Sequence, residues 1–378
     1  MSVGTAALIL VLSVFNGFED LVKSLYSSFY ADMKISPVSG KQIILTEAQL
    51  NKLRSVNGVN SISLVIEEKA MLVNGEHQSN AYLKGVDENY SKVSGVSRYM
   101  IKGVYDVGDS SNPKLVLGAG VENAIGLQSD RNLAPLMIYT GRKGEMDMLN
   151  PIKNVSSATA NTSGAFIIEQ EFDNKYAITN LAFMRILLDL PADHYSSAEI
   201  DIDETADPEV LQEILALQLG NKYSVQTRYQ QNSSLYAVMQ AEKWVIYAIL
   251  SLILVVAAFN MIGALTMLVL EKKEDIKVLQ ALGATKKLIQ NIFLNLGLLL
   301  GLVGGGIGML IAFIIAWLQI HYKLIPLQGG SFLIDYFPVK LEPKDFALVA
   351  VTILVIALLA SFIPARKAAN QQLSLRDE

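Results

Sequence analysis

Four long apolar runs divide the chain. They cover residues 1–18, 244–270, 292–318 and 346–363, and none of them holds an Asp, Glu, Lys or Arg. As α-helices, the second and third runs would each extend about 40 Å and the fourth about 27 Å, against a membrane hydrocarbon core of about 30 Å. The sequence therefore predicts an α-helical membrane domain with four spans.

The first run differs from the others in its flanks. It begins at Met1 with no Lys or Arg before it and has no A-x-A cleavage site, so it is not a typical signal peptide. A helix over residues 1–17 would extend only about 25 Å, which is short for a complete span. We expect a truncated first span with residues missing upstream.

The basic residues next to the spans predict the orientation of the chain. Five lysines follow the second run, at 272, 273, 277, 286 and 287, and Arg366, Lys367 and Arg376 follow the fourth. Cytoplasmic flanks carry such an excess of positive charge, so the large polar segment before the second span is expected outside the cytoplasm. The predicted order is a first span at 1–18, an external domain at 19–240, a second span at 241–270, a cytoplasmic loop at 271–289, a third span at 290–320, an external loop at 321–344, a fourth span at 345–365 and a cytoplasmic tail at 366–378.

The external segment mixes strand and helix patterns. Short runs rich in β-forming residues predict strands at 41–45, 61–73, 114–117, 136–139, 166–169 and 198–202. Asn74-Gly75 indicates a tight hairpin turn. Thr46 caps one predicted helix and Asp207-Pro208 opens another, in which Val210, Leu211, Ile214, Leu215 and Leu219 form an apolar stripe expected to face the core. An α+β domain of about two lobes follows.

One stretch of this segment, residues 141–164, has neither a helical nor a strand period. It is rich in Ser, Thr and Asn and contains Met146, Met148, Leu149 and Pro151. This composition predicts a long projecting loop. The loop is either a mobile connector or a partner-binding loop, since exposed Met and Leu suit an adaptable apolar contact.

The composition removes several classes of function. Hydrophobic residues make up 51% of the 378 and charged residues 18%, and the net charge is −5, which disfavours a nucleic-acid partner. Without cysteine and with three histidines, a metal centre is not expected. The sequence has no phosphate-binding G-x-x-x-x-G-K-S/T and no G-x-S-x-G element. We expect a chain that is not an enzyme and holds no cofactor.

The loop after the second span has the sequence EKKEDIKVLQALGATKK, residues 271–287. It predicts a short helix that ends at Leu282, with Gly283 as its C-terminal cap and Thr285 capping the next helix. Ile276, Leu279, Ala281 and Leu282 form an apolar strip on it. The strip is expected to bind a cytoplasmic partner, or else to lie on the membrane surface as an amphipathic turn.

The third run carries small residues at four-residue spacing. Gly297, Gly301 and Gly305 form one row. Small residues let helices approach closely in lipid, so we expect this row to pack against the fourth span.

Three stretches of the chain resemble the permease subunits of lipoprotein-releasing ABC transporters, the LolC/LolE family, within the FtsX-like and MacB-like group. They are VGTAALILVLSVFNGFE at 3–19, AEKWVIYAILSLILVVAAFNMIGALTMLVLEKKEDIKVLQALGATKK at 241–287, and IPARKAAN at 363–370. The wider group is indicated by the pattern around Asp275-Ile276 and Leu282-Gly283-Ala284, and the lipoprotein branch by Asn16-Gly17-Phe18-Glu19.

The resemblance implies a multi-pass protein of the bacterial inner membrane with its large domain in the periplasm. It implies a dimer with a second permease subunit, identical or not, on two copies of a separate ATPase that binds ATP and Mg. It also implies a lipoprotein substrate, a periplasmic lipoprotein carrier and contact with membrane lipid.

The resemblance also implies three groups of functional residues. The ATPase-coupling residues would be Asp275, Ile276, Leu279, Leu282, Gly283 and Ala284. The residues lining a lipid-chain cavity would be Val11, Phe15, Val255, Phe259 and Met267. The carrier-binding loop would be residues 144–157, with Met146, Met148, Leu149 and Pro151.

Two other transport-like interpretations and one enzymatic interpretation stay open at this point. A MacB-like exporter of peptides or small molecules would need an outer-membrane duct as its partner. An FtsX-like signalling protein would activate a cell-wall hydrolase, although the external domain of that family is usually smaller. A membrane-anchored enzyme would need chemistry in the external domain that no motif reveals.

Overall fold

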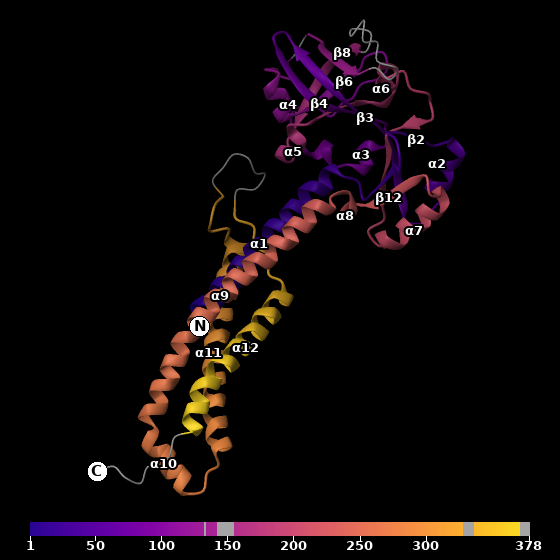
Figure 1. Cartoon of the computed structure of the whole chain (residues 1–378). Coiled ribbons are helices and arrows are strands. Elements are labelled where there is room, and N and C mark those ends of the chain that lie inside the picture. The colour runs from indigo at the N-terminus through magenta and orange to yellow at the C-terminus, as the bar shows by residue number, and fades with distance from the viewer. Residues whose placement is uncertain (132–133, 142–154, 328–335, 371–378) are drawn as a thin grey trace, which may run out of the picture. The chain divides into compact units, whose positions relative to one another are not determined.

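A computed structural model describes residues 1–131, 134–141, 155–327 and 336–370, and these residues divide into two compact units (Figure 1). The first unit combines residues 1–21 with most of the chain from Leu235 onward, and the second unit comprises residues 22–234. The two units are described separately below.

The first unit is helical. Its elements are α1 (Ser2–Phe29), α9 (Ser233–Glu271), α10 (Lys273–Ala281), α11 (Lys286–Tyr322) and α12 (Pro343–Ala369). Four of these helices, all except α10, are long and apolar enough to cross a membrane. Together with the α+β second unit described below, they confirm the predicted fold class.

Helix α1 is longer than the apolar run at its start. The run ends at Phe18, but the helix continues to Phe29, about 42 Å in all. The continuation keeps an apolar face, since Leu25, Tyr26 and Phe29 are buried in the second unit. A single helix thus supplies residues to both units, and the same holds for α9, whose first two residues belong to the second unit.

The glycines of α11 allow close contact with α12. A Cβ atom placed on Gly297 would lie 2.3 Å from the Ser361 Cβ, one on Gly301 would lie 2.4 Å from the Ala357 Cβ, and one on Gly305 would lie 3.0 Å from Ile353. Gly308 meets α1 in the same way, at the Ser2 carbonyl. These distances leave no room for any side chain, so α11 packs against α12 through its backbone.

We expect Gly301→Ala to destabilise the helical unit by about 1–3 kcal/mol, because the new methyl group overpacks the contact with Ala357. Gly306→Ala is the matched control on the same helix, since nothing lies within 4 Å of that position. The control gains the same helix propensity, about 1 kcal/mol, without a clash. Thermal unfolding in detergent measures both variants, and equal melting temperatures would contradict the close packing.

The second unit is α+β. Its strands are β1 (Met33–Pro37), β2 (Ile43–Ile44), β3 (Val59–Asn74), β4 (His77–Val86), β5 (Met100–Gly103), β6 (Lys114–Gly118), β7 (Leu136–Gly141), β8 (Val155–Phe166), β9 (Tyr176–Asn180), β10 (His194–Tyr195), β11 (Ser197–Ile202) and β12 (Tyr223–Thr227). Its helices are α2 (Glu47–Arg54), α3 (Tyr90–Val93), α4 (Ala119–Ala124), α5 (Gln170–Asp173), α6 (Leu181–Leu187), α7 (Pro208–Leu219) and α8 (Arg228–Gln231), with a 3-10 turn, η1, at Val96–Tyr99.

Six of these strands form a closed ring. Strand β3 pairs with β4, β4 with β9, β9 with β6, β6 with β8, β8 with β7, and β7 returns to the far end of β3. The long β3 makes this possible because its first half pairs with β11 and its second half with β7. Leu72, Leu83, Leu117 and Ile138, each fully buried, belong to the core that the ring shares with the adjoining sheet.

Beyond β3, the sheet continues through β11, β1 and β12. Helix α7 packs on β12 at this end. Leu211 and Leu215 of α7 are buried, but Val210 and Ile214 are exposed, so the prediction that all five residues of its stripe face the core is wrong for these two. The helix buries only the side of its apolar stripe that carries Leu211 and Leu215.

The hairpin at Asn74-Gly75 is present between β3 and β4, with Gly75 at φ +60°. The predicted loop at 141–164 is wrong in its second half, where β8 begins at Val155. Strand β8 is polar because it alternates small Ser, Thr and Ala side chains, yet it pairs with β7 on one side and β6 on the other. The strand predicted at 166–169 is β8's last residue followed by a turn into α5.

A buried ion pair lies where the end of α1 enters the second unit. Lys84 Nζ lies 2.8 Å from Glu199 Oε1, and both side chains are almost fully buried. The ammonium also lies 5.0 Å from the Phe29 ring and 4.8 Å from the Tyr90 ring. Burial opposes the charge of Lys84, but attraction to and the hydrogen bond with Glu199, together with smaller contributions from Tyr90 and Glu67, hold the lysine pKa well above its usual value. The pair thus stays charged and links β4 to β11 beneath the end of α1.

Lys84→Met should destabilise the protein by about 3–5 kcal/mol, because it leaves the Glu199 carboxylate buried without its partner. The double variant Lys84→Met with Glu199→Leu should lose less than Lys84→Met alone. Lys41→Met is the control, since the Lys41–Glu68 pair is exposed and such pairs contribute about 0–1 kcal/mol. Chemical denaturation measures the free energy of unfolding of the three variants. A double variant less stable than Lys84→Met alone would contradict the proposed role of the buried ion pair.

Candidate functional site

Helix α10 and its C-cap residue, Leu282, carry three exposed apolar side chains. Leu282 is 80% exposed, Val278 58% and Leu279 41%. Val278 was missed by the sequence analysis, although it lies one residue before Leu279 in the same helix. These three side chains, called here the α10 patch, have no covering element among the described residues of the chain.

One predicted coupling residue faces the other way. Ile276 is buried, in a cluster with Val269 of α9, Ile289 and Phe293 of α11, and Ala365 and Ala368 of α12. Its burial is a departure from the prediction that it contacts a partner directly. Instead, Ile276 attaches α10 to three spans at once, so a displacement of α10 is carried to all of them.

The ends of α10 are shaped by short-range contacts. Asp275 is exposed and pairs with Lys272 at 2.9 Å. Gly283 has φ +94°, a left-handed conformation that ends the helix, and Thr285 then caps α11 by accepting from the Leu288 N–H. Ala284 packs at the edge of the Ile276 cluster. Asp275, Gly283 and Ala284 therefore fix the geometry in which the α10 patch is presented.

The predicted cavity residues lie on two outward apolar stripes. On α9, Val255, Phe259 and Met267 are exposed at four- and eight-residue spacing, and Gly263 between them has nothing within 4 Å of its Cβ position. On α1, Val11 is exposed and Phe15 half-buried. A different set of side chains, Leu8, Ile9 and Leu12 of α1 with Leu254, Ala258 and Met261 of α9, is buried in one apolar cluster together with residues of α11 and α12. These six residues are called here the α1–α9 seam.

The predicted carrier-loop residues Met146, Met148, Leu149 and Pro151 lie outside the described residues. The described residues on both sides of that segment, Gly141 and Val155, line a groove of about 750 Å³ in the second unit. Tyr82, Tyr139 and two lysines, Lys69 and Lys175, complete its wall.

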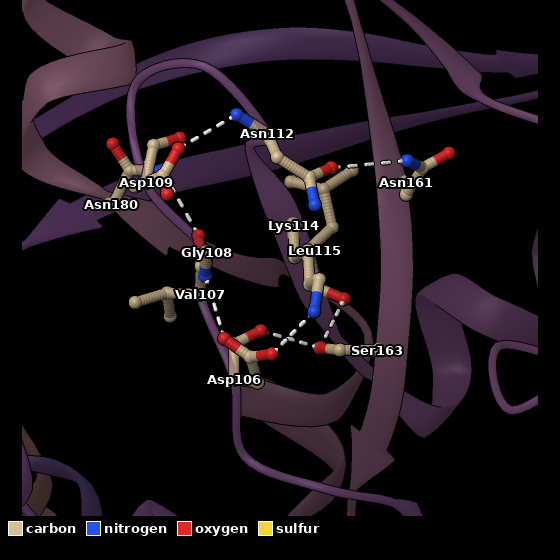
Figure 2. Close-up of polar contacts among 10 residues, drawn as sticks. All are labelled: Asp106, Val107, Gly108, Asp109, Asn112, Lys114, Leu115, Asn161, Ser163 and Asn180. Atoms are coloured by element: carbon tan, nitrogen blue, oxygen red, sulfur yellow. Dashed lines mark hydrogen bonds and ion pairs between the residues drawn. The ribbon is translucent and has the colours of Figure 1, made fainter.

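The acidic residues between β5 and β6 are structural. Figure 2 shows Asp106 facing Lys114, and Ser163 donating to the backbone carbonyls of Asp106 and Leu115. The hydrogen bond from Lys114, helped by the Gly108 N–H, lowers the pKa of the Asp106 carboxyl. Asp109 is held in the same way by Ser111 and by backbone N–H groups, which lower its pKa. The carboxylates of Asp106 and Asp109 therefore stabilise the loop between β5 and β6 through local hydrogen bonds.

Within the described ranges, no group of three or more His, Asp or Glu side chains is placed to hold a metal ion. The polar contacts of the described residues include those of the loop in Figure 2, the buried Lys84–Glu199 pair and a cluster at one end of the spans.

That last cluster joins three spans and was not predicted. Asn16 of α1 donates to Asp345 of α12 at 2.6 Å and accepts from Lys243 of α9 at 2.8 Å, and Lys243 also lies 3.3 Å from Asp345. Asn16 and Asp345 are buried. Residues 16, 243 and 345 all stand at one boundary of their apolar runs, which is the signal that could have brought them together.

Comparison with known proteins agrees with this architecture. Residues 247–373 match the family described as FtsX-like permease C-terminal. The chain is 26% identical to the lipoprotein-releasing system transmembrane protein LolE of Haemophilus influenzae, over 98% of this chain and 91% of the relative. It is 23% identical to LolC of Neisseria meningitidis, over 98% of this chain and 90% of the relative.

Two solved structures resemble part of the chain. The periplasmic region of MacB from Actinobacillus actinomycetemcomitans is 15% identical, covers 57% of this chain and 98% of its own, and has a TM-score of 0.39. The extracellular domain of the transporter YknZ from Gram-positive bacteria is 10% identical, covers 52% of this chain and 99% of its own, and has a TM-score of 0.36.

Proposed function

Because the chain is an FtsX-like permease with distant LolC and LolE homologues along nearly its whole length, we propose that it is the transmembrane subunit of a lipoprotein-releasing ABC transporter. In this proposal it lies in the bacterial inner membrane, takes lipoproteins from the outer leaflet and passes them to a periplasmic carrier. The observation that carries the proposal is α10, which is exposed on its outer face and attached to three spans by Ile276 on its inner face.

The energy for this transport comes from a separate cytoplasmic ATPase dimer, which binds ATP and Mg. The absence of a phosphate-binding loop from the sequence fits that division of labour. The α10 patch is the docking surface for the ATPase. An exposed apolar anchor of this kind contributes most of its binding energy when a partner pocket removes it from water.

Replacing Leu279 and Leu282 by Asp should abolish co-purification of the ATPase with this chain, because two charges would enter an apolar pocket. Leu217→Asp is the matched control, since Leu217 on α7 is 85% exposed and belongs to the second unit. The control should retain the ATPase in full. An ATPase that remains bound to the double variant would refute the docking assignment.

The route for lipid chains follows the two apolar stripes of α1 and α9. The apolar surface of these stripes is not covered by other described residues of the chain; it consists of Val11, Phe15, Val255, Phe259 and Met267. A second permease subunit, identical or not, would face this surface across a cavity. Acyl chains in that cavity replace membrane lipid at no cost in apolar exposure.

A photo-crosslinking residue at Val255 or Phe259 should label an acylated lipoprotein in the assembled transporter. The control position is Leu359, which is 68% exposed on α12 but off both stripes. Labelling should depend on the acyl chains of the lipoprotein. If the stripe positions label no lipid-bearing protein, the lipoprotein assignment fails, and export of another cargo or signalling to a hydrolase would replace it.

The carrier is proposed to bind the second unit at residues 144–157, through Met146, Met148, Leu149 and Pro151. The groove that begins at Gly141 and Val155 supports this placement, because it offers tyrosine rings and lysines beside the same segment. Aromatic and methionine side chains are common anchors of adaptable protein contacts.

A further inference from the structure

The Asn16-Gly17-Phe18 motif ends the apolar part of α1, and each of its three residues has a separate contact. Asn16 uses its amide nitrogen for Asp345 and its amide oxygen for Lys243. A Cβ atom on Gly17 would lie 2.4 Å from the Pro338 carbonyl, so only glycine lets the backbone before α12 cross α1 here. Phe18 packs edge-on against Phe337 at 6.0 Å.

The segment that crosses α1 at this point is held on both sides. The Lys340 N–H donates to the Ser13 carbonyl at 2.9 Å, and the Lys340 side chain pairs with Asp20. At the other end, the Gln319 amide of α11 donates to the carbonyls of Ile325 and Phe337. The end of α1 is therefore enclosed by Lys243 on one side and by residues 336–342 on the other.

The polar contacts at this end differ in kind from the α1–α9 seam. The seam is apolar, and lipid tails can replace its contacts when the helices separate, because lipid is as apolar as the side chains it replaces. Lipid cannot replace the hydrogen bonds to Asp345, since its carboxylate is buried and a buried carboxylate that loses its partner is strongly disfavoured. The cluster, rather than the seam, thus decides whether α1 and α9 stay together.

We propose that Lys243, through Asn16 and Asp345, is a releasable closure at the outer end of the α1–α9 seam, which must open for a lipid-bearing cargo to pass. The inference rests on the proposed function for the identity of the cargo. In this proposal Lys243 is a positioning residue that holds the outer ends of α1, α9 and α12 together. A displacement of α9 or α12, driven through α10, separates Lys243 from Asn16 and Asp345.

The test uses Ser13→Cys in the complete transporter, reconstituted in lipid without nucleotide. The chain has no other cysteine, and Ser13 is buried one turn before Asn16 beneath residues 336–342. A water-soluble maleimide added from the outside should label it slowly. In a Lys243→Met background, labelling should be about tenfold faster, the effect of losing a charge-assisted hydrogen bond.

Three further variants distinguish loss of the closure from a general loss of structure. Lys243→Arg should keep slow labelling, because it retains the charge, and Asp345→Asn should behave like Lys243→Met. Lys344→Met, the exposed neighbour of Asp345, should label as slowly as the parent. Equal labelling of Lys243→Met and Lys344→Met in complexes that still hold the ATPase would overturn the closure.

A second arm tests whether opening is needed for transport. A Cβ atom on Gly4 would lie 3.0 Å from Leu254 Cδ2, so a short bis-methanethiosulfonate reagent should crosslink cysteines placed at positions 4 and 254. The crosslink should stop lipoprotein release, and a reductant should restore it. Release at the full rate with the crosslink formed would overturn the gating role. If Lys243→Met speeds labelling in a transporter that releases no lipoprotein, the closure by Lys243 is supported and the assignment of a lipoprotein as the cargo is refuted.

Discussion

The structure of the helical unit depends on the absence of side chains along one face of α11. In a bilayer, lipid competes equally for apolar surface, so helices associate only where close packing or hydrogen bonds give more than lipid does. The row of Gly297, Gly301 and Gly305 brings the backbone of α11 against Ser361, Ala357 and Ile353, and Gly308 continues the contact to α1. The positions of α12 and α1 follow from this row.

Helix α10 is supported through the same contact. Because α11 packs against α12, Ala365 and Ala368 lie in one cluster with Phe293 and Ile289. These four residues and Val269 form the buried apolar cluster around Ile276. Helix α10 is therefore packed against three spans at once. Two of the spans, α1 and α9, are continuous helices that contribute residues to the second unit. The buried Lys84–Glu199 pair and the Phe29 ring fix the end of α1 in that unit.

The spans and two of the three residues of the α10 patch could be predicted because their signals are local. Apolar runs, Gly283 and Thr285 act within a few residues, and they place Leu279 and Leu282 on an exposed helix. The role of Ile276 depends on residues almost a hundred positions away in α12, and the pattern of α10 alone cannot separate it from Leu279. Strand β8 was missed because pairing on both edges, rather than hydrophobicity, makes it a strand. The Asn16 cluster joins positions more than 200 residues apart, beyond any local pattern.

The central claim is that α10 receives force on one side of the membrane and the second unit responds on the other. Single cysteines at Leu282, in the α10 patch, and at Leu217, on α7, test it directly with a membrane-impermeant maleimide, because both side chains are at least 80% exposed and the chain has no cysteine of its own. The account predicts that intact cells with a permeabilised outer membrane label position 217 and not 282, and that inverted vesicles label 282 and not 217. Labelling of both positions from the same side would contradict it.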